Sequence, residues 1–261
     1  MRSAQPHPTC IIVEGIGLPG VGKSTLLHQA ADMLRARGYP VSEESYRIGH
    51  DTGAPGRQLA KVLLAVGAVL RHPWRALSSL AWIRRSRQHS LHDFLRVTLN
   101  WFYINGLFEQ QLQHPGIHCF DEGLFQACWS IGYRAGNPAT LTEAPGRLFT
   151  MPTVMLIVSV SAEMETVAQR LHHRPESHSR LEQQGVDAIQ LEHSLTIIQQ
   201  IEMLIKRLAE SREEHGHLQL VRVRNDENQA RETSGRLIGN TVIDMMESYM
   251  MENKNSAEIE R

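Results

Sequence analysis

The chain has 261 residues, of which 41% are hydrophobic and 21% are charged. This composition is that of a folded globular protein and excludes an intrinsically disordered chain. The 27 basic and 28 acidic residues give a formal net charge of -1, so we expect no nucleic acid polymer as a partner. Three cysteines, Cys10, Cys119 and Cys128, are too few for a disulfide scaffold and favour a reducing compartment.

The start of the chain does not resemble a targeting segment. Residues 1–9 contain two prolines, one arginine and no apolar stretch, unlike a secretory signal peptide. No uncharged apolar run reaches the roughly 18 residues that a membrane-spanning helix needs. We therefore expect a soluble, cytoplasmic protein.

Short apolar runs alternate with helical patterns along the chain. An unbroken β-branched run such as residues 10–13 is typical of a strand covered on both faces of a parallel sheet. The predicted strands are residues 10–13, 39–44, 117–120, 154–160 and 218–223. Because helical patterns separate them, the sequence predicts an α/β fold with a five-stranded parallel sheet.

The segment of about residues 55–113 is predicted to be a helical insert, broken near Pro73. Its apolar residues recur at helical spacing, which favours packing in the core. In residues 57–70 these are Leu59, Val62, Leu63, Val66, Val69 and Leu70, and in residues 91–112 they are Leu95, Leu99, Phe102, Tyr103, Leu107 and Leu112.

A basic stretch without acids lies inside this insert. Residues 52–92 contain no Asp or Glu and seven basic residues: Arg57, Lys61, Arg71, Arg75, Arg84, Arg85 and Arg87. Such a run is most often a solvated helix face. The alternative is a surface that faces phosphates or an anionic membrane, which would make residues 57–87 a peripheral membrane contact.

The strongest motif is a glycine-rich segment that follows the first predicted strand. It matches G-x-x-x-x-G-K-[ST] in full with Gly17, Leu18, Pro19, Gly20, Val21, Gly22, Lys23 and Ser24, and Thr25 follows. In such a loop the backbone N–H groups and the start of the next helix bind phosphates. The lysine reaches the β- and γ-phosphates, and the hydroxyl is a Mg²⁺ ligand. The motif predicts binding of ATP and Mg²⁺ by residues 17–25.

Further acids follow two predicted strands. Asp121 ends the strand at residues 117–120, where an open α/β sheet binds its ligands, so we predict it to be a Mg²⁺ ligand together with Ser24. Glu122 is a candidate base beside it or an ordinary solvent-facing acid. Glu43 and Glu44 stand at the end of the second predicted strand, and Glu44 is a second candidate base or an ordinary loop carboxylate.

An arginine-rich segment follows the fourth predicted strand. Arg170, Arg174 and Arg180 lie in a polar stretch that contains Pro175, so one helix face cannot hold all three. We predict a closing lid over about residues 170–185, in which arginines stabilise a phosphoryl group in flight. A solvated basic loop is the alternative.

The chain resembles the P-loop small-molecule kinases, most closely the thymidylate kinase-like group and its deoxynucleoside kinase relatives. The glycine-rich loop, Glu43 and Glu44, Asp121 and the lid arginines carry this resemblance, which covers about residues 9–226. It implies a three-layer P-loop NTPase fold. We expect one domain over residues 1–245, and a tail over residues 246–261 because the sequence becomes polar there. At position 122 the chain has Glu where the group has Arg, and Arg96 is a candidate for supplying that charge.

The resemblance implies an enzyme that transfers the γ-phosphoryl group of ATP-Mg²⁺ to a small acceptor, such as a nucleoside or nucleoside monophosphate. In this reading Lys23, Arg174 and Arg180 stabilise the transferring group, and Arg170 contributes to ATP binding. An ATPase that acts as a hydrolytic or conformational switch is the alternative, with Glu122 orienting water. A GTPase is disfavoured, because Asn225-Asp226-Glu227-Asn228 lacks the lysine of a guanine-reading motif.

Overall fold

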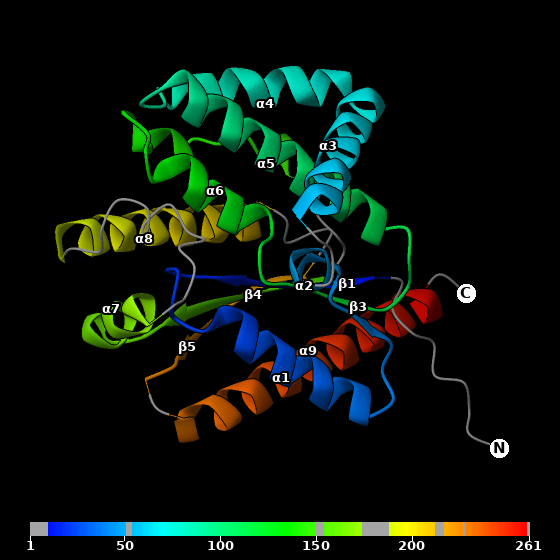
Figure 1. Cartoon of the computed structure of the whole chain (residues 1–261). Coiled ribbons are helices and arrows are strands. Elements are labelled where there is room, and N and C mark those ends of the chain that lie inside the picture. Colours follow the sequence, from blue (N-terminus) through cyan, green and yellow to red (C-terminus); the bar gives the residue numbers. More distant parts are fainter. Residues whose placement is uncertain are drawn as a thin grey trace.

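A five-stranded parallel sheet lies at the centre of the protein, which we describe from a computed structural model (Figure 1). The structure describes residues 10–50, 54–149, 154–173, 188–211, 217–226 and 228–259. Within them the strand order is β2-β3-β1-β4-β5. The strands are β1 (Ile11–Ile16), β2 (Val41–Ser42), β3 (Ile117–Phe120), β4 (Val154–Ser161) and β5 (His217–Arg224).

Helices cover both faces of this sheet, as the α/β prediction requires. In the described residues they are α1 (Lys23–Ala36), α2 (Glu44–His50), α3 (Ala54–Arg71), α4 (Pro73–Arg85), α5 (Leu91–Gln111), α6 (Leu124–Gly132), α7 (Met164–His172), α8 (Ala188–Glu210) and α9 (Asn228–Ile259). Figure 1 shows α1 and α9 on one face, and α5, α6 and α8 on the other. The arrangement is therefore a three-layer α/β structure, and α4 lies farthest from the sheet, outside α5.

The central strands are buried along their whole length, which explains their unbroken apolar sequences. Every residue of β1 and of β3 is buried, and β1 is paired on both sides, with β3 and with β4. A strand with helices on both faces has no solvent-facing side, so it does not alternate polar and apolar residues. The prediction of a five-stranded parallel sheet is confirmed.

The second strand is shorter than predicted. Instead of residues 39–44, β2 spans only Val41–Ser42, and α2 begins at Glu44. A carboxylate is favourable in the first turn of a helix, where the dipole is positive. Glu44 therefore starts a helix and does not end a strand.

Two predicted boundaries can be compared with the helices. Pro73 is the first residue of α4, a position where the missing N–H of proline has no cost, so the predicted break there is confirmed. At the other end of the chain, α9 continues through residues 245 and 246 to Ile259, and Met246 is buried. The boundary that we predicted before a polar tail therefore falls inside a helix.

The predicted packing of residues 57–70 is wrong for most of the apolar side chains. Helix α3 packs against α5 through a face that carries the buried Ala65 and Ala68. The opposite face holds Leu59, Val62, Leu63, Val66 and Leu70, with exposed fractions between 43% and 74%. The period of the pattern identified a helix. Residues 62–70 of this helix are apolar on every side, however, so the period did not identify the buried face.

In the first turns of α5, too, some apolar side chains that were predicted to be buried are exposed. Leu95 and Leu99 are exposed, whereas Phe102, Tyr103 and Leu107 are buried as predicted, and Leu112 packs against the core from a partly buried position. Trp74, in α4, is 81% exposed. Trp82, Trp101 and Trp129 are buried.

The close approach of α3 and α5 gives a test of the fold. A Cβ atom on Gly106 would lie 2.9 Å from the carbonyl carbon of Leu64 and closer still to its oxygen. Gly106→Ala should therefore lower the free energy of unfolding by about 1–3 kcal/mol, because backbone must move. At Gly67 a Cβ atom would meet only the end of the Arg71 side chain, at 3.4 Å. Gly67→Ala should be neutral or stabilising by up to about 1 kcal/mol. Urea unfolding measures both, and equal losses would contradict this packing.

Candidate functional site

The candidate site lies where two neighbouring strands end. β1 and β3 are adjacent and parallel, so their carboxyl ends lie at the same edge of the sheet. The helix that follows β1 covers one face of the sheet, and the helix that follows β3 covers the other (Figure 1). Their divergence opens a crevice at the strand ends, which is where open α/β sheets bind ligands.

The glycine-rich loop (residues 17–24) connects β1 to α1 at this edge. Gly17 and Gly22 have φ angles of 148° and 92°, in the region that favours glycine. A Cβ atom would also collide with the carbonyl oxygen of Val160 at Gly17, and with the side-chain amide of Asn225 at Gly22. The glycines are thus required both by conformation and by the approach of β4 and β5.

Lys23 is the first residue of α1, and its side chain turns back over the loop. Its Nζ atom donates to the carbonyl oxygens of Gly17 at 2.9 Å and Leu18 at 3.0 Å. The first turn of α1 has no acidic residue. The loop therefore combines an ammonium group with an uncompensated helix N-terminus, and both favour an anion.

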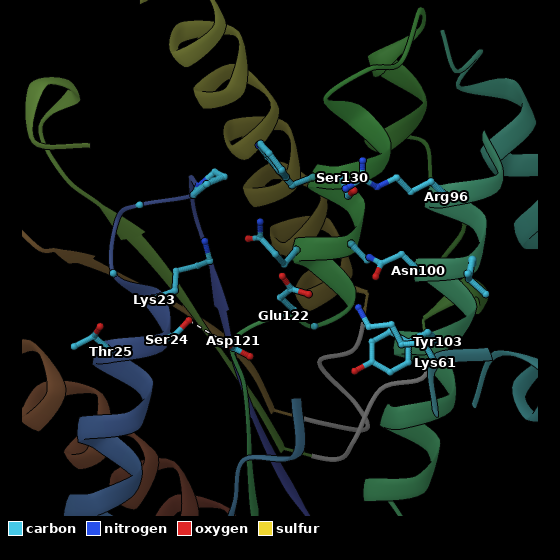
Figure 2. Close-up of a pocket in the computed structure, with 18 of the residues that line it drawn as sticks. Lys23, Ser24, Thr25, Lys61, Arg96, Asn100, Tyr103, Asp121, Glu122 and Ser130 are labelled. Atoms are coloured by element: carbon cyan, nitrogen blue, oxygen red, sulfur yellow. Dashed lines mark hydrogen bonds between the residues drawn. The ribbon is translucent and has the colours of Figure 1, made fainter. Parts of the chain in front are cut away.

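Asp121 joins three parts of the site. It follows β3 directly, and its Oδ2 atom accepts a hydrogen bond of 2.9 Å from the Ser24 hydroxyl (dashed line in Figure 2). Its Oδ1 atom accepts a bond of 2.8 Å from the Ser45 hydroxyl of α2. The hydroxyl and carboxylate predicted as Mg²⁺ ligands thus lie together, and oxygen donors of these types suit that cation. Ser45 carried no signal in the sequence.

A buried carboxyl lies beneath the loop. Glu14, in β1, is fully buried, and its Oε1 atom accepts bonds from the backbone N–H of Phe125 (2.7 Å) and Gln126 (2.9 Å) at the start of α6. The Gln126 side chain in turn accepts a bond of 3.1 Å from the N–H of Gly17. A Cβ atom on Gly123 would collide with the Glu14 carboxyl. Glu14 therefore links α6 to the glycine-rich loop.

Burial changes the acidity of this group. Loss of solvation raises the pKa of Glu14 from 4.5 to about 8, although the backbone N–H groups of α6 oppose the rise. Its Oε2 atom has no hydrogen-bond partner among the described residues. The only signal in the sequence was one acid inside an apolar strand.

A cavity of about 430 Å³ opens beside the loop and Asp121. Its near wall includes Lys23, Ser24, Thr25 and Glu122. Figure 2 shows a far wall formed by helices α3 and α5 of the insert, together with α6. That wall carries Lys61, Arg96, Asn100, Tyr103, Trp129 and Ser130.

Most of the far wall was not predicted from the sequence, which indicated only Arg96 as a candidate for a charge at the site and Lys61 as part of the basic stretch. The ammonium of Lys61 lies 5.0 Å from the centre of the Tyr103 ring, a cation–π distance. Burial and the nearby carboxylates of Glu122 and Asp121 raise the pKa of the Tyr103 hydroxyl. The wall thus offers cations, hydrogen-bond donors and an aromatic face to a ligand.

The structure does not bring every predicted residue to the cavity. Glu44 forms a 2.8 Å ion pair with Arg47 and does not line the cavity. Glu43 is buried and pairs with Arg35. Arg170 donates to the carbonyl oxygens of Val21, Asn225 and Asp226, so in this structure it ties α7 to the loop. The lid residues Arg174 and Arg180 lie outside the described residues.

The described residues lack a metal-binding cluster and a membrane-spanning helix. No group of three or more His, Cys, Asp or Glu side chains is arranged to hold a metal ion there. The helices found there include none with the length and apolar character needed to cross a membrane.

No protein-family model and no curated protein matches the chain significantly.

The buried carboxyl predicts a pH dependence of stability. Because the pKa of Glu14 rises on folding, its stabilising contribution is complete below about pH 4.5 and is lost as the pH rises toward 8. Between these values the free energy of unfolding should fall by at least about 1 kcal/mol more for the native protein than for Glu14→Gln. Urea unfolding at several pH values measures this, with Glu44→Gln, the same chemical change at a carboxylate outside the core, as the comparison. A Glu14→Gln variant with the native slope would contradict the raised pKa.

Proposed function

We propose that the protein is an enzyme that transfers the γ-phosphoryl group of ATP to a small acceptor. The observation that carries this proposal is the cavity, in which a glycine-rich loop, Lys23, Ser24 and Asp121 face a second wall of polar side chains. The phosphates of ATP need only the first wall. The second wall leaves room for an acceptor next to the phosphate end of the site.

The residues of the near wall fit ATP and Mg²⁺. Backbone N–H groups of residues 17–24 and the start of α1 would bind the phosphates, and Lys23 would neutralise them. Ser24 and Asp121 would hold Mg²⁺, which supplies charge neutralisation at the phosphates when it is bound. Their hydroxyl and carboxylate oxygens are 2.9 Å apart, close enough to share one cation.

The role of base is better assigned to Glu122 than to Glu44. Glu122 lines the cavity beside Asp121, whereas Glu44 is paired with Arg47 outside it. Glu122 would orient or deprotonate an acceptor hydroxyl, and a phosphate acceptor would need no base. The same position also supports the alternative function, a hydrolytic ATPase switch in which Glu122 orients water. Arg174 and Arg180 remain proposed lid residues for either reaction.

Phosphoryl transfer can be tested directly. The protein is incubated with γ-labelled ATP, Mg²⁺ and panels of nucleosides, nucleoside monophosphates, sugars and amino-alcohols. We expect label in one acceptor class, and a loss of at least about 100-fold with Lys23→Ala, since an electrostatic stabiliser is removed. Lys206→Ala changes an exposed lysine of α8 and should leave the rate unchanged. Release of phosphate at a rate independent of any acceptor would favour the switch. Equal rates for Lys23→Ala and the native protein would exclude this site from the reaction.

A further inference from the structure

The outer face of the helical insert is apolar and exposed. On α3 the exposed side chains are Leu59, Val62, Leu63, Val66 and Leu70, which recur every three or four residues and form one stripe along the helix. The opposite face of α3 packs on α5 and contributes Lys61 to the cavity. Continuous apolar patches are rare on the surface of monomeric proteins, so this one indicates a partner.

Helix α4 follows α3 directly in the chain, packs against it and carries two more exposed apolar side chains. Trp74 and Leu77, three residues apart, are 81% and 56% exposed. The buried side chains of α4, including Trp82 and Ile83, lie elsewhere around the helix. We call the exposed apolar residues of α3 and α4, from Leu59 to Leu77, the apolar stripe. Figure 1 shows both helices on the side of the molecule away from the sheet.

Positive charge accompanies the apolar stripe. Four arginines are exposed: Arg71 at the end of α3, Arg84 and Arg85 at the end of α4, and Arg87 just beyond it. No acid occurs in residues 52–92. Two acids close to these helices are buried and paired: Asp93 with Arg134 at 3.2 Å, and Glu109 with Arg71 at 3.6 Å and with Arg75. Neither is therefore available to neutralise the basic groups at the end of α4.

We propose that the apolar stripe binds the surface of an anionic membrane. Helices that lie in the membrane interface carry Leu and Trp on the face toward the lipid and Lys or Arg beside it. Here Leu59, Leu63, Leu70 and Trp74 would enter the boundary between headgroups and acyl chains. Arg84 and Arg85 would lie at the level of the anionic headgroups.

A second copy of the chain suits this surface less well. In a two-fold dimer the same patch meets itself, so Arg84, Arg85 and Arg87 of both copies would enter one contact. Asp93 and Glu109 are buried and already paired with other arginines, so they cannot compensate that repulsion. An anionic lipid surface can accept the apolar side chains among its acyl chains and the arginines among its headgroups at the same time.

Vesicle flotation of the full-length protein tests the proposal. We expect binding to vesicles of phosphatidylcholine mixed with phosphatidylglycerol, weaker binding to phosphatidylcholine alone, and loss of binding at high salt. Leu63→Gln/Leu70→Gln should weaken binding about tenfold or more by removing apolar contact. Arg84→Gln/Arg85→Gln should weaken it about tenfold and reduce its salt dependence.

A matched control uses apolar side chains on another face. Ile189 and Met203 of α8 are exposed to a similar degree, at 79% and 55%, and Ile189→Gln/Met203→Gln should bind vesicles like the native protein. Circular dichroism of each variant checks that it is folded. Absence of binding to anionic vesicles, or equal losses in the control, would overturn the proposal. So would a native dimer that Leu63→Gln/Leu70→Gln converts to a monomer, because a second copy would then cover the stripe.

Discussion

The candidate site depends on the hydrogen bond between Ser24 and Asp121. It joins the first turn of α1 to the end of β3, across the crevice that opens because α1 and α6 leave the sheet on opposite faces. Ser45 holds the other oxygen of the same carboxylate, so α2 is fixed to this point as well. One carboxylate therefore sets the positions of three elements around the space beside the glycine-rich loop.

The buried carboxyl group of Glu14 also helps to fix the glycine-rich loop. Glu14 accepts two backbone N–H groups of α6, and Gln126 carries that constraint on to Gly17. This arrangement has a thermodynamic cost, since burial makes ionisation of Glu14 unfavourable. In return, the buried hydrogen bonds hold the loop in one position. A phosphate site needs this, because its backbone N–H groups must point at the phosphates in a fixed arrangement.

The parts of this account that could be predicted are those that local sequence determines. The β1 run, the glycine-rich loop and the helix after it are contiguous, and Asp121 ends an apolar run, so their order and proximity followed from the rules of parallel sheets. The far wall could not be predicted in this way. Lys61, Asn100 and Tyr103 reach the cavity only because α3 and α5 pack against each other at Gly106, a contact between segments some forty residues apart.

The wrong predictions for α3 and for Glu44 have a similar physical cause. Leu63 and Leu70 were expected in the core, but they are exposed. A helical period shows which residues share a helix face, but it does not show whether another element covers that face. Glu44 was expected at the end of a strand, but the dipole of α2 begins there and the strand is only two residues long. In both cases the outcome depended on a neighbouring element that the local pattern does not contain.

The most direct test of the central claim is the Mg²⁺ dependence of ATP binding, measured by calorimetry. The claim is that Ser24 and Asp121 together form the metal end of a triphosphate site. It predicts that Asp121→Asn raises the Mg²⁺ concentration needed for half-maximal binding about tenfold or more, because a charged oxygen ligand is lost. Glu44→Gln, the same chemical change at a carboxylate outside the cavity, should leave the titration unchanged. Identical titrations for Asp121→Asn and the native protein would contradict the claim.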